Sequence, residues 1–252
     1  MINFNTSIVI QARLSSTRLP KKIFKEILEK KIIEYMLDQL EFIKKDIPII
    51  VATTNNKNDD SLEKFLKLNS INYFRGSEQN VLSRYCDAIR KFKISNVIRL
   101  TSDCPLIDPN NISELLKIFI NENLDYISTD ETYPDGMDVE IIKAKCFLEI
   151  ENLKLLRYQK EHPTQYIVEN SNYYKFKKLS LKNNHKDVRI TIDEEEDYMF
   201  LEEVIHFLHK KNLNPPYKMN DILKIIYEKK LMKINKHILR NEGLIKSKLK
   251  NS

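Results

Sequence analysis

The sequence predicts an α/β fold in which a mostly parallel, doubly wound sheet carries helices on both faces. Short apolar segments typical of strands alternate with amphipathic segments typical of helices four times in the first hundred residues. Such alternation is the pattern of a parallel sheet with crossover helices. The 252 residues, 42% of them apolar, suit one such domain with a small β/α addition after the fifth strand.

Each predicted element rests on a local pattern. Apolar and β-branched runs bounded by polar turns predict the strands, and these are 8–12, 49–54, 71–74, 96–100, 124–129, 137–141, 173–179 and 188–192. Apolar residues three and four positions apart, several of them after an Asp or Asn that can cap a helix, predict the helices. These helices are 30–45, 60–68, 80–92, 109–120, 144–170 in two pieces, 194–210 and 219–230.

The excess positive charge lies at the C-terminal end. The net charge is +6, but from Lys224 onward nine Lys or Arg residues stand against two Glu residues, so the preceding part is close to −1. We predict a globular domain over residues 1–223 and a basic helical tail over residues 224–252. A body without a basic face of its own does not favour nucleic-acid binding.

The cysteine pattern and the apolar runs indicate a cytoplasmic protein without a membrane span. Cys86, Cys104 and Cys146 are far apart, odd in number and without a CxxC pair, which favours reduced thiols over a disulfide framework. The first residues lack the pattern of a signal peptide. No apolar run approaches the roughly 18 residues that a membrane span needs.

A basic loop follows the first predicted strand. The strand ends near Ala12, and the next ten residues contain Arg13, Ser15, Arg18 and Lys22. Arginine, lysine and hydroxyl groups beyond the carboxyl end of a buried strand suit a polyphosphate ligand. The loop has no glycine, which excludes a Walker A loop and a GxGxxG fingerprint. The alternative is an ordinary basic surface loop after an edge strand.

Two aspartates each follow a predicted strand. Asp103 comes after the strand at 96–100, and Asp193 comes after the strand at 188–192. Carboxylates at the same edge as the basic loop could hold Mg²⁺ against phosphate oxygens. The alternatives are a turn-forming Asp for Asp103 and a helix cap for Asp193.

Three further segments carry polar groups that a small-molecule site could use. Each also has a purely structural interpretation: the first as a strand-to-helix turn, the second as a solvent-facing strand and the third as a packed helix residue. In order of the chain they contain Gly76, Ser77 and Arg84; then Asp135, Asp138 and Glu140; then His162.

An ordered set of motifs resembles a known family. The segments are QARLSSTRLPKK, FRGSE, DCPLID, YPDGMDVE and EHPTQYI, and they occur in that order. Together they resemble the cytidylyltransferases that make CMP-linked sugar acids, and most closely the branch named for spore coat polysaccharide biosynthesis protein F. The chain departs from this pattern at Lys21, where the family has glycine, and at Glu194 and Glu195, where it has Thr-Pro.

The resemblance implies Mg²⁺-dependent transfer of CMP from CTP to a sugar acid or related acceptor, with release of pyrophosphate. It implies catalytic roles for Arg13, Arg18 and Lys22, and nucleotide binding by Ala12, Arg13, Ser15, Lys22, Gly76, Ser77 and Arg84. It also implies acceptor binding by Asp135, Asp138, Glu140 and His162, and metal binding by Asp103 and Asp193. Members of the family are commonly dimers, so a homodimer is one expectation.

Two other functions stay open at the level of sequence. A glycosyltransferase of similar fold would use a finished nucleotide sugar, but it would carry a DxD metal motif where this chain reads SDCP, with a single acid. A non-catalytic nucleotide-binding protein would use its basic tail to contact an anionic surface. The apolar tail residues Ile234, Ile238 and Leu239 instead suggest packing on the body or on a partner subunit.

Overall fold

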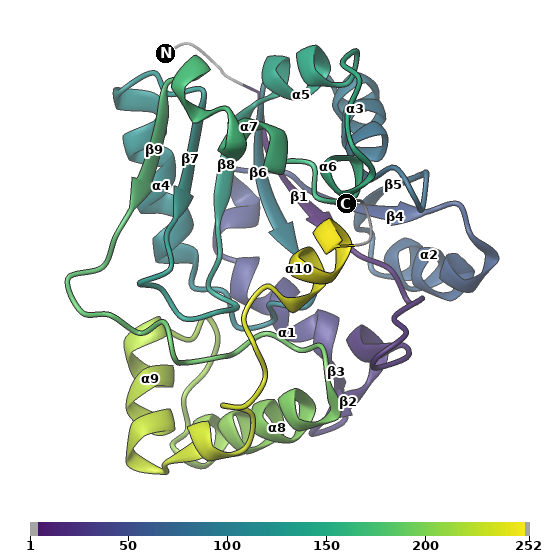
Figure 1. Ribbon diagram of the computed structural model, residues 1–252. Coiled ribbons are helices and arrows are strands. Elements are labelled where there is room, and N and C mark those ends of the chain that lie inside the picture. The colour runs from purple at the N-terminus through teal and green to yellow at the C-terminus, as the bar shows by residue number, and fades with distance from the viewer. Residues whose placement is uncertain (1–4, 250–252) are drawn as a thin grey trace.

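The computed structural model describes residues 5–249. Its centre is a seven-stranded sheet with the order β5-β4-β1-β6-β8-β7-β9 (Figure 1). The strands are β1 Thr6–Gln11, β4 Ile49–Thr54, β5 Asn72–Gly76, β6 Asn96–Thr101, β7 Tyr126–Thr129, β8 Glu140–Lys143 and β9 Phe176–Leu179. A separate small hairpin joins β2 Glu26–Ile27 to β3 Lys30–Lys31.

Helices cover both faces of this sheet. They are α1 Ile32–Leu40, α2 Asp60–Leu68, α3 Val81–Phe92, α4 Pro109–Asn121, α5 Ala144–Ile150, α6 Arg157–Glu161, α7 Gln165–Glu169, α8 Glu195–Lys210, α9 Met219–Glu228 and α10 Glu242–Leu249. Short 3-10 turns lie at Lys22–Phe24, Ile43–Lys45, Lys57–Asp59, Ser171–Tyr173 and Leu231–Lys233.

Strand β1 shows why the sheet is buried on both sides. Successive side chains of a strand point to opposite faces. Ile8 and Ile10 therefore pack with α1, α2 and α4, whereas Val9 packs with α3, α5 and α7 on the other face. A third apolar cluster lies beside the sheet and joins α1 to α8 and α9. The doubly wound arrangement predicted from the sequence is confirmed.

The sheet is mostly parallel, as predicted. The pairs β1–β4, β1–β6, β4–β5 and β7–β9 are parallel, and β8 runs antiparallel to both of its neighbours. Helix α4 begins where the sequence indicated: the Asp108 carboxylate accepts the N–H of Asn110 and Pro109 takes the first helical turn.

The predicted strand at 188–192 is wrong. This segment is extended and buried, but outside the named strands it forms a single bridge, between Asp135 and Arg189. Its backbone bonds go to two different loops: Ile190 donates to Asp135 O, and Ile192 donates to Asp103 O. An extended segment buried between two loops needs the same apolar, β-branched composition as a strand inside a sheet. The sequence pattern therefore could not distinguish such a segment from a strand.

Smaller differences concern element ends. The predicted helix at 30–45 begins at Ile32, because Lys30 and Lys31 pair in the hairpin. The predicted helical region 144–170 consists of three helices and not two. Asp138 lies before β8, which starts at Glu140.

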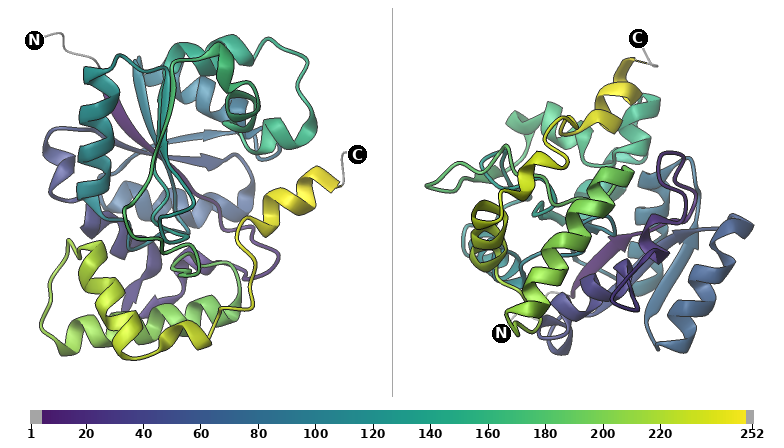
Figure 2. Two further views of the ribbon diagram at one scale, coloured as in Figure 1. Left: turned by 60° about the vertical axis from the view of Figure 1, so that its left-hand side comes forward. Right: turned by 90° about the horizontal axis from the view of Figure 1, so that it is seen from below.

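The C-terminal segment packs on the body. From the layer of α8 and α9 it runs up to the edge of the sheet, where α10 lies (Figures 1 and 2). Asn235 is buried and Ile234 is partly buried against the third cluster, whereas Leu239 is exposed. The proposed boundary at residue 224 stays a prediction. Within residues 5–249, no helix is both long and apolar enough to cross a membrane.

Candidate active site

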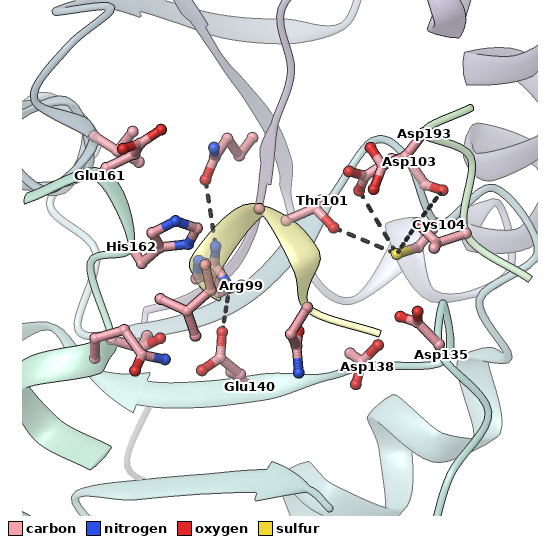
Figure 3. Close-up of a pocket in the computed structure, with 18 of the residues that line it drawn as sticks. Arg99, Thr101, Asp103, Cys104, Asp135, Asp138, Glu140, Glu161, His162 and Asp193 are labelled. Carbon is pink, nitrogen blue, oxygen red and sulfur yellow. Dashed lines mark hydrogen bonds and ion pairs between the residues drawn. The ribbon is translucent and has the colours of Figure 1, made fainter. Parts of the chain in front are cut away.

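A cavity of about 750 Å³ lies at the edge of the sheet where β1 and β6 end (Figure 3). The basic loop, the segment after β6, the acidic turn before β8, helices α6 and α7, and residues 241–244 of the tail all contribute to its lining. The predicted site residues on this lining are Arg13, Arg18, Lys22, Arg84, Asp103, Asp135, Asp138, Glu140, His162 and Asp193. The structure therefore brings together residues that are up to 180 positions apart.

Hydrogen bonds donated by backbone N–H groups hold the basic loop at both ends. Leu14 N donates to the Asp59 carboxylate at 2.7 Å, and Lys21 N donates to Leu14 O at 3.1 Å. Lys21 has φ 54° and ψ 27°, which is the left-handed region that favours glycine. The position where the related family has glycine thus keeps a left-handed conformation in this chain, and the turn presents Lys22 to the cavity.

Lys22 lies between the two predicted metal-binding carboxylates. Its Nζ is 3.1 Å from Asp103 Oδ2 and 2.7 Å from Asp193 Oδ1, and it also donates to Ile192 O at 2.8 Å. Burial acts against the charge of Lys22, but the two carboxylates outweigh it and raise its pKa. Burial likewise acts against the Asp103 carboxylate, yet Lys22 and a bond from Thr101 lower its pKa to about 2. Both groups are therefore ionised at neutral pH.

Arg18 has a more exposed position and three acidic neighbours. Its guanidinium lies 3.1 Å from Asp193, 3.0 Å from Glu194 and 3.3 Å from Glu242. Arg13 is exposed on the same cavity and has no hydrogen bond or ion pair within the described part of the chain. Both guanidinium groups are placed to meet an anionic ligand.

A buried ionic brace holds the Asp193 segment. Arg189 makes two bonds of 2.9 Å to the carboxylate of Asp197 and one of 2.6 Å to Asp135. Asp197 is fully buried and also accepts the backbone N–H groups of Asp193 and Glu194. Such a paired and fully bonded charge group fixes the direction of the chain at Asp193. The position of Arg189, four residues before Asp193, suggests pairing with the acids of this segment, whereas no local pattern predicts its contact with Asp135, 54 positions away.

The two carboxylates fit a magnesium ion. One Nζ atom lies within 3.1 Å of an oxygen from each of Asp103 and Asp193, so both groups already converge on one cationic centre. Among residues 5–249 there is no cluster of three or more potential ligands. Mg²⁺ is commonly held by only one or two carboxylates together with substrate phosphates and water. The donor set would therefore suit Mg²⁺ that is shared with a phosphate-bearing ligand.

Arg84 stands out among the predicted nucleotide-binding residues because it is fully buried and has no carboxylate partner among residues 5–249. Its Nη1 donates to Ser77 O at 2.7 Å, whereas its Nε and Nη2 have no hydrogen-bond partner in the part of the chain described. Burial lowers its pKa to about 10. Its side chain packs against Gly76, where a Cβ atom would lie only 3.0 Å from Arg84 Cγ.

The remaining nucleotide-binding candidates lie behind the lining. Ala12 is buried, and its N–H donates to Ala52 O. The Ser15 hydroxyl donates to Glu78 at 2.6 Å, and Glu78 itself lines the cavity. Ala12, Ser15, Gly76 and Ser77 therefore adjoin the cavity without forming its surface, and their binding roles stay predictions.

The predicted acceptor-binding acids form one wall, and each has a cationic partner. Asp135 pairs with Arg189, Asp138 with Arg240 at 2.6 Å, and Glu140 with Arg99. Burial and the nearby Asp138 raise the pKa of Asp135 to about 6. Glu140 also accepts the hydroxyl of Tyr126 at 2.6 Å.

His162 lies on the same wall. It follows α6, and its Nε2 is buried without a hydrogen-bond partner among residues 5–249. Burial lowers its pKa, which keeps the imidazole neutral at physiological pH. A neutral imidazole with a free nitrogen can accept a proton or bind a polar substrate group.

Two cavity features were missed at the level of sequence. Arg99 in β6 was not among the predicted site residues. A charged residue that stands between apolar residues of a buried strand is unusual, and this was the signal that could have revealed it. No tail residue was among the predicted site residues, but Arg240 and Glu242 contact residues of the cavity. No local pattern signals the second feature, because it depends on contacts with residues more than a hundred positions away.

A doubly wound sheet with a basic loop beyond its first strand and a carboxylate pair across from it defines a nucleotide-binding α/β protein of the transferase type. Comparison with known proteins makes this specific. The sequence profile described as cytidylyltransferase matches residues 7–245, and the chain therefore belongs to the cytidylyltransferase family. This match continues past Lys224 into the tail.

Individual relatives agree with the family. Spore coat polysaccharide biosynthesis protein SpsF of Bacillus subtilis is 33% identical over 201 residues, which cover 75% of this chain and 82% of that protein. A cytidylyltransferase structure from Leptospira borgpetersenii aligns with a TM-score of 0.85 at 29% identity, over 94% of this chain and all of the other. The CTP complex of CMP:2-keto-3-deoxy-manno-octonic acid synthetase shares the fold, with a TM-score of 0.61 at 14% identity over 80% of this chain and 98% of that chain.

The resemblance read from the ordered motifs is thus confirmed, including the SpsF branch, and so is the assignment as a nucleotidyltransferase. The glycosyltransferase and the non-catalytic alternatives lose their support. The roles of single site residues remain predictions.

Proposed function

We propose that this protein transfers CMP from CTP to a sugar acid or a related acceptor, with Mg²⁺ as cofactor and pyrophosphate as leaving group. The observation that carries the proposal is the convergence of Asp103 and Asp193 on the ammonium group of Lys22. Two carboxylates beside a fixed cation form an arrangement that suits a metal-bound triphosphate.

The reaction needs positioning and charge more than covalent chemistry. An oxygen of the acceptor attacks the α-phosphorus of CTP, the new P–O bond forms, and the bond to the pyrophosphate oxygen breaks. Bound Mg²⁺, held by Asp103 and Asp193, would neutralise phosphate charge. Lys22, Arg13 and Arg18 neutralise the charge that develops on the departing pyrophosphate.

The acceptor wall supplies the other half of the reaction. If the attacking group is a hydroxyl, its proton has to leave, and our candidate base is the neutral imidazole of His162. Asp135, Asp138 and Glu140 are all engaged in ion pairs, which keeps this wall rigid and oriented. The relative named for spore coat polysaccharide biosynthesis supports a sugar-derived acceptor, and the synthetase named for 2-keto-3-deoxy-manno-octonic acid supports a sugar acid.

Nucleotide-dependent thermal stabilisation tests the nucleotide half of this proposal. We expect CTP with Mg²⁺ to raise Tm more than ATP, GTP or UTP, because binding to the native state alone stabilises it. Asp103→Asn should abolish the effect of Mg²⁺, whereas Asp46→Asn, an exposed change outside the cavity lining, should not. No stabilisation by any triphosphate would contradict the proposal.

Pyrophosphate release tests the acceptor half. With CTP and Mg²⁺ present, 3-deoxy-manno-octulosonate and N-acetylneuraminate are the first acceptors to compare, and chelation of the metal should stop release. CTP-selective stabilisation without release from either acid would leave the nucleotide site intact and reject these two acceptors.

A further inference from the structure

The C-terminal segment is anchored in two places before it reaches the cavity. Asn235 is buried, and its amide donates to Arg189 O at 3.1 Å and to Asp197 at 3.0 Å. Arg240 donates to Tyr133 O at 2.8 Å and to the Asp138 carboxylate at 2.6 Å. These contacts fix the path of the chain up to residue 240. Residue 242 follows two positions later and is therefore held close to the cavity.

At that position Glu242 contacts the basic loop. Its Oε2 lies 3.3 Å from Arg18 Nη1, and its Oε1 lies 2.7 Å from Lys246 one helical turn later. Residues 241–244 line the same cavity as Arg18, Lys22 and the two aspartates. In the close-up, the yellow ribbon of this C-terminal segment appears among the labelled cavity residues, in agreement with its place on the lining (Figure 3).

The single positive charge of Arg18 therefore faces three carboxylates. It contacts the carboxylates of Asp193 and Glu194 as well as that of Glu242. Asp193 and Glu194 belong to the segment held by the buried Arg189–Asp197 brace, so they are fixed in place. The third carboxylate, that of Glu242, belongs to the tail. It can move away from Arg18 without breaking any bond of the Arg189–Asp197 brace.

We propose that Glu242 is a determinant of triphosphate affinity: it competes with the β- and γ-phosphates for Arg18, and triphosphate displaces it. The inference rests on the proposed function, because it needs Arg18 to bind the triphosphate. Phosphate oxygens carry more charge than one carboxylate and accept the guanidinium fork equally well, so CTP wins this competition.

Displacement of Glu242 also frees the contacts that follow it. Helix α10 touches the acceptor side of the cavity, where Ser247 donates to Glu161 at 2.8 Å and Lys248 pairs with Glu169 at 2.8 Å. Arg240 and Asn235 stay in place, so the movement is confined to residues 241–249. Nucleotide binding at the basic loop thereby loosens a cover on the acceptor side.

Titration calorimetry with pyrophosphate, CTP and CMP tests the competition directly. We expect Glu242→Gln to bind pyrophosphate and CTP about three- to fivefold tighter than the unaltered protein, the size of effect given by one partly exposed ion pair. CMP, which lacks the β- and γ-phosphates, should bind with less than a twofold change. Glu196→Gln removes a nearby negative charge that does not contact Arg18, and it should leave all three affinities unchanged.

A second variant separates charge at Arg18 from release of the tail. Glu194→Gln also removes a carboxylate from Arg18 but leaves the contact of Glu242 intact. In hydrogen exchange, amides 242–249 should exchange faster when CTP is added to the unaltered protein. They should already be fast in Glu242→Gln without nucleotide, and slow in Glu194→Gln without nucleotide.

The outcomes distinguish this inference from the proposed function. Unchanged pyrophosphate affinity in Glu242→Gln, or unchanged exchange of residues 242–249 on CTP binding, overturns the role of Glu242. If Arg18→Met binds CTP and pyrophosphate as tightly as the unaltered protein does, the assignment of Arg18 to the triphosphate fails first. Weaker binding in Arg18→Met together with unchanged binding in Glu242→Gln leaves the proposed function standing and removes this inference alone.

Discussion

The Nζ atom of Lys22 lies 2.7 Å from Oδ1 of Asp193, although 171 positions separate the two residues in the sequence. The contact joins the first loop of the chain to the segment before α8, and with Asp103 it completes a compact charged centre. The site consequently depends on the loops after β1 and β6 and the segment before α8 being brought together.

Replacement of Lys22 should slow the reaction more than it weakens CTP binding. In Lys22→Met the departing pyrophosphate loses a fixed positive charge, so we expect kcat to fall about 100- to 1,000-fold while KM for CTP changes less than tenfold. Steady-state pyrophosphate release measures both constants. Lys25→Met, which removes a partly exposed cation paired with Glu195 outside the cavity lining, is the control. Unchanged turnover would remove Lys22 from the mechanism.

Replacement of Arg84 should have opposite effects on stability and binding. Arg84 is a buried charge with two nitrogen atoms unpaired among the described residues. Arg84→Met removes that uncompensated charge, and we expect the free energy of unfolding to rise by about 1–3 kcal/mol. Affinity for CTP should fall tenfold or more if the free nitrogens bind the nucleotide. Urea unfolding and calorimetry give the two numbers, and lower stability with unchanged CTP affinity would show a purely structural role.

Gly136 should tolerate no side chain. Its φ is +99°, and an added Cβ would lie 2.5 Å from Thr191 N. Because the obstacle is backbone, Gly136→Ala should lower the free energy of unfolding by at least about 2 kcal/mol.

Gly243 provides the matched comparison. Gly243 lies in α10, and apart from its chain neighbours and its own helix backbone, no atom of residues 5–249 lies within 4 Å of its added Cβ. Gly243→Ala should be neutral or stabilising by about 0.5–1 kcal/mol. Equal effects of the two substitutions in urea unfolding would contradict the assigned close approach at Gly136.

Asp135 should give stability an unusual dependence on pH. Burial and Asp138 raise its pKa to about 6 from an ordinary value of 3.8, so the native state holds a proton that the unfolded chain has already lost. The stabilisation from this proton is complete below about pH 4 and is lost as pH rises through about 6. The total is about 3 kcal/mol, from roughly two pKa units at 1.36 kcal/mol each.

Urea unfolding between pH 4 and pH 7 checks this prediction. The difference in unfolding free energy between the unaltered protein and Asp135→Asn should fall by about 3 kcal/mol across that range. The pKa of Asp103 is lowered to about 2, so its titration lies below this window and does not interfere. A difference that does not change with pH would show that Asp135 stays ionised throughout.

Local signals were enough to predict the sheet and the basic loop. The run Ile8–Ile10 followed at once by cations predicted both β1 and the loop at its end, and Asp103 after β6 was predicted in the same way. These inferences succeed because the carboxyl ends of parallel strands share one edge of a sheet.

Contacts between distant segments could not be predicted. The segment 188–192 has the composition of a strand, but its buried backbone is satisfied by Asp135 and Asp103 instead of a ladder. The reversed direction of β8 and the reach of Arg240 to Asp138 likewise depend on tertiary packing and not on any local periodicity.

The contact between Arg18 and Glu242 spans 224 positions of the chain, and this has a consequence for the order of folding. Pairings of low sequence separation form early, whereas loop closure over such lengths is slow. The alternating units around β1, β4 and β5 can reach their native arrangement while the last residues are still being synthesised. The cavity acquires its full lining only when residues 241–244 arrive, so in refolding experiments helical signal should return before catalytic competence does.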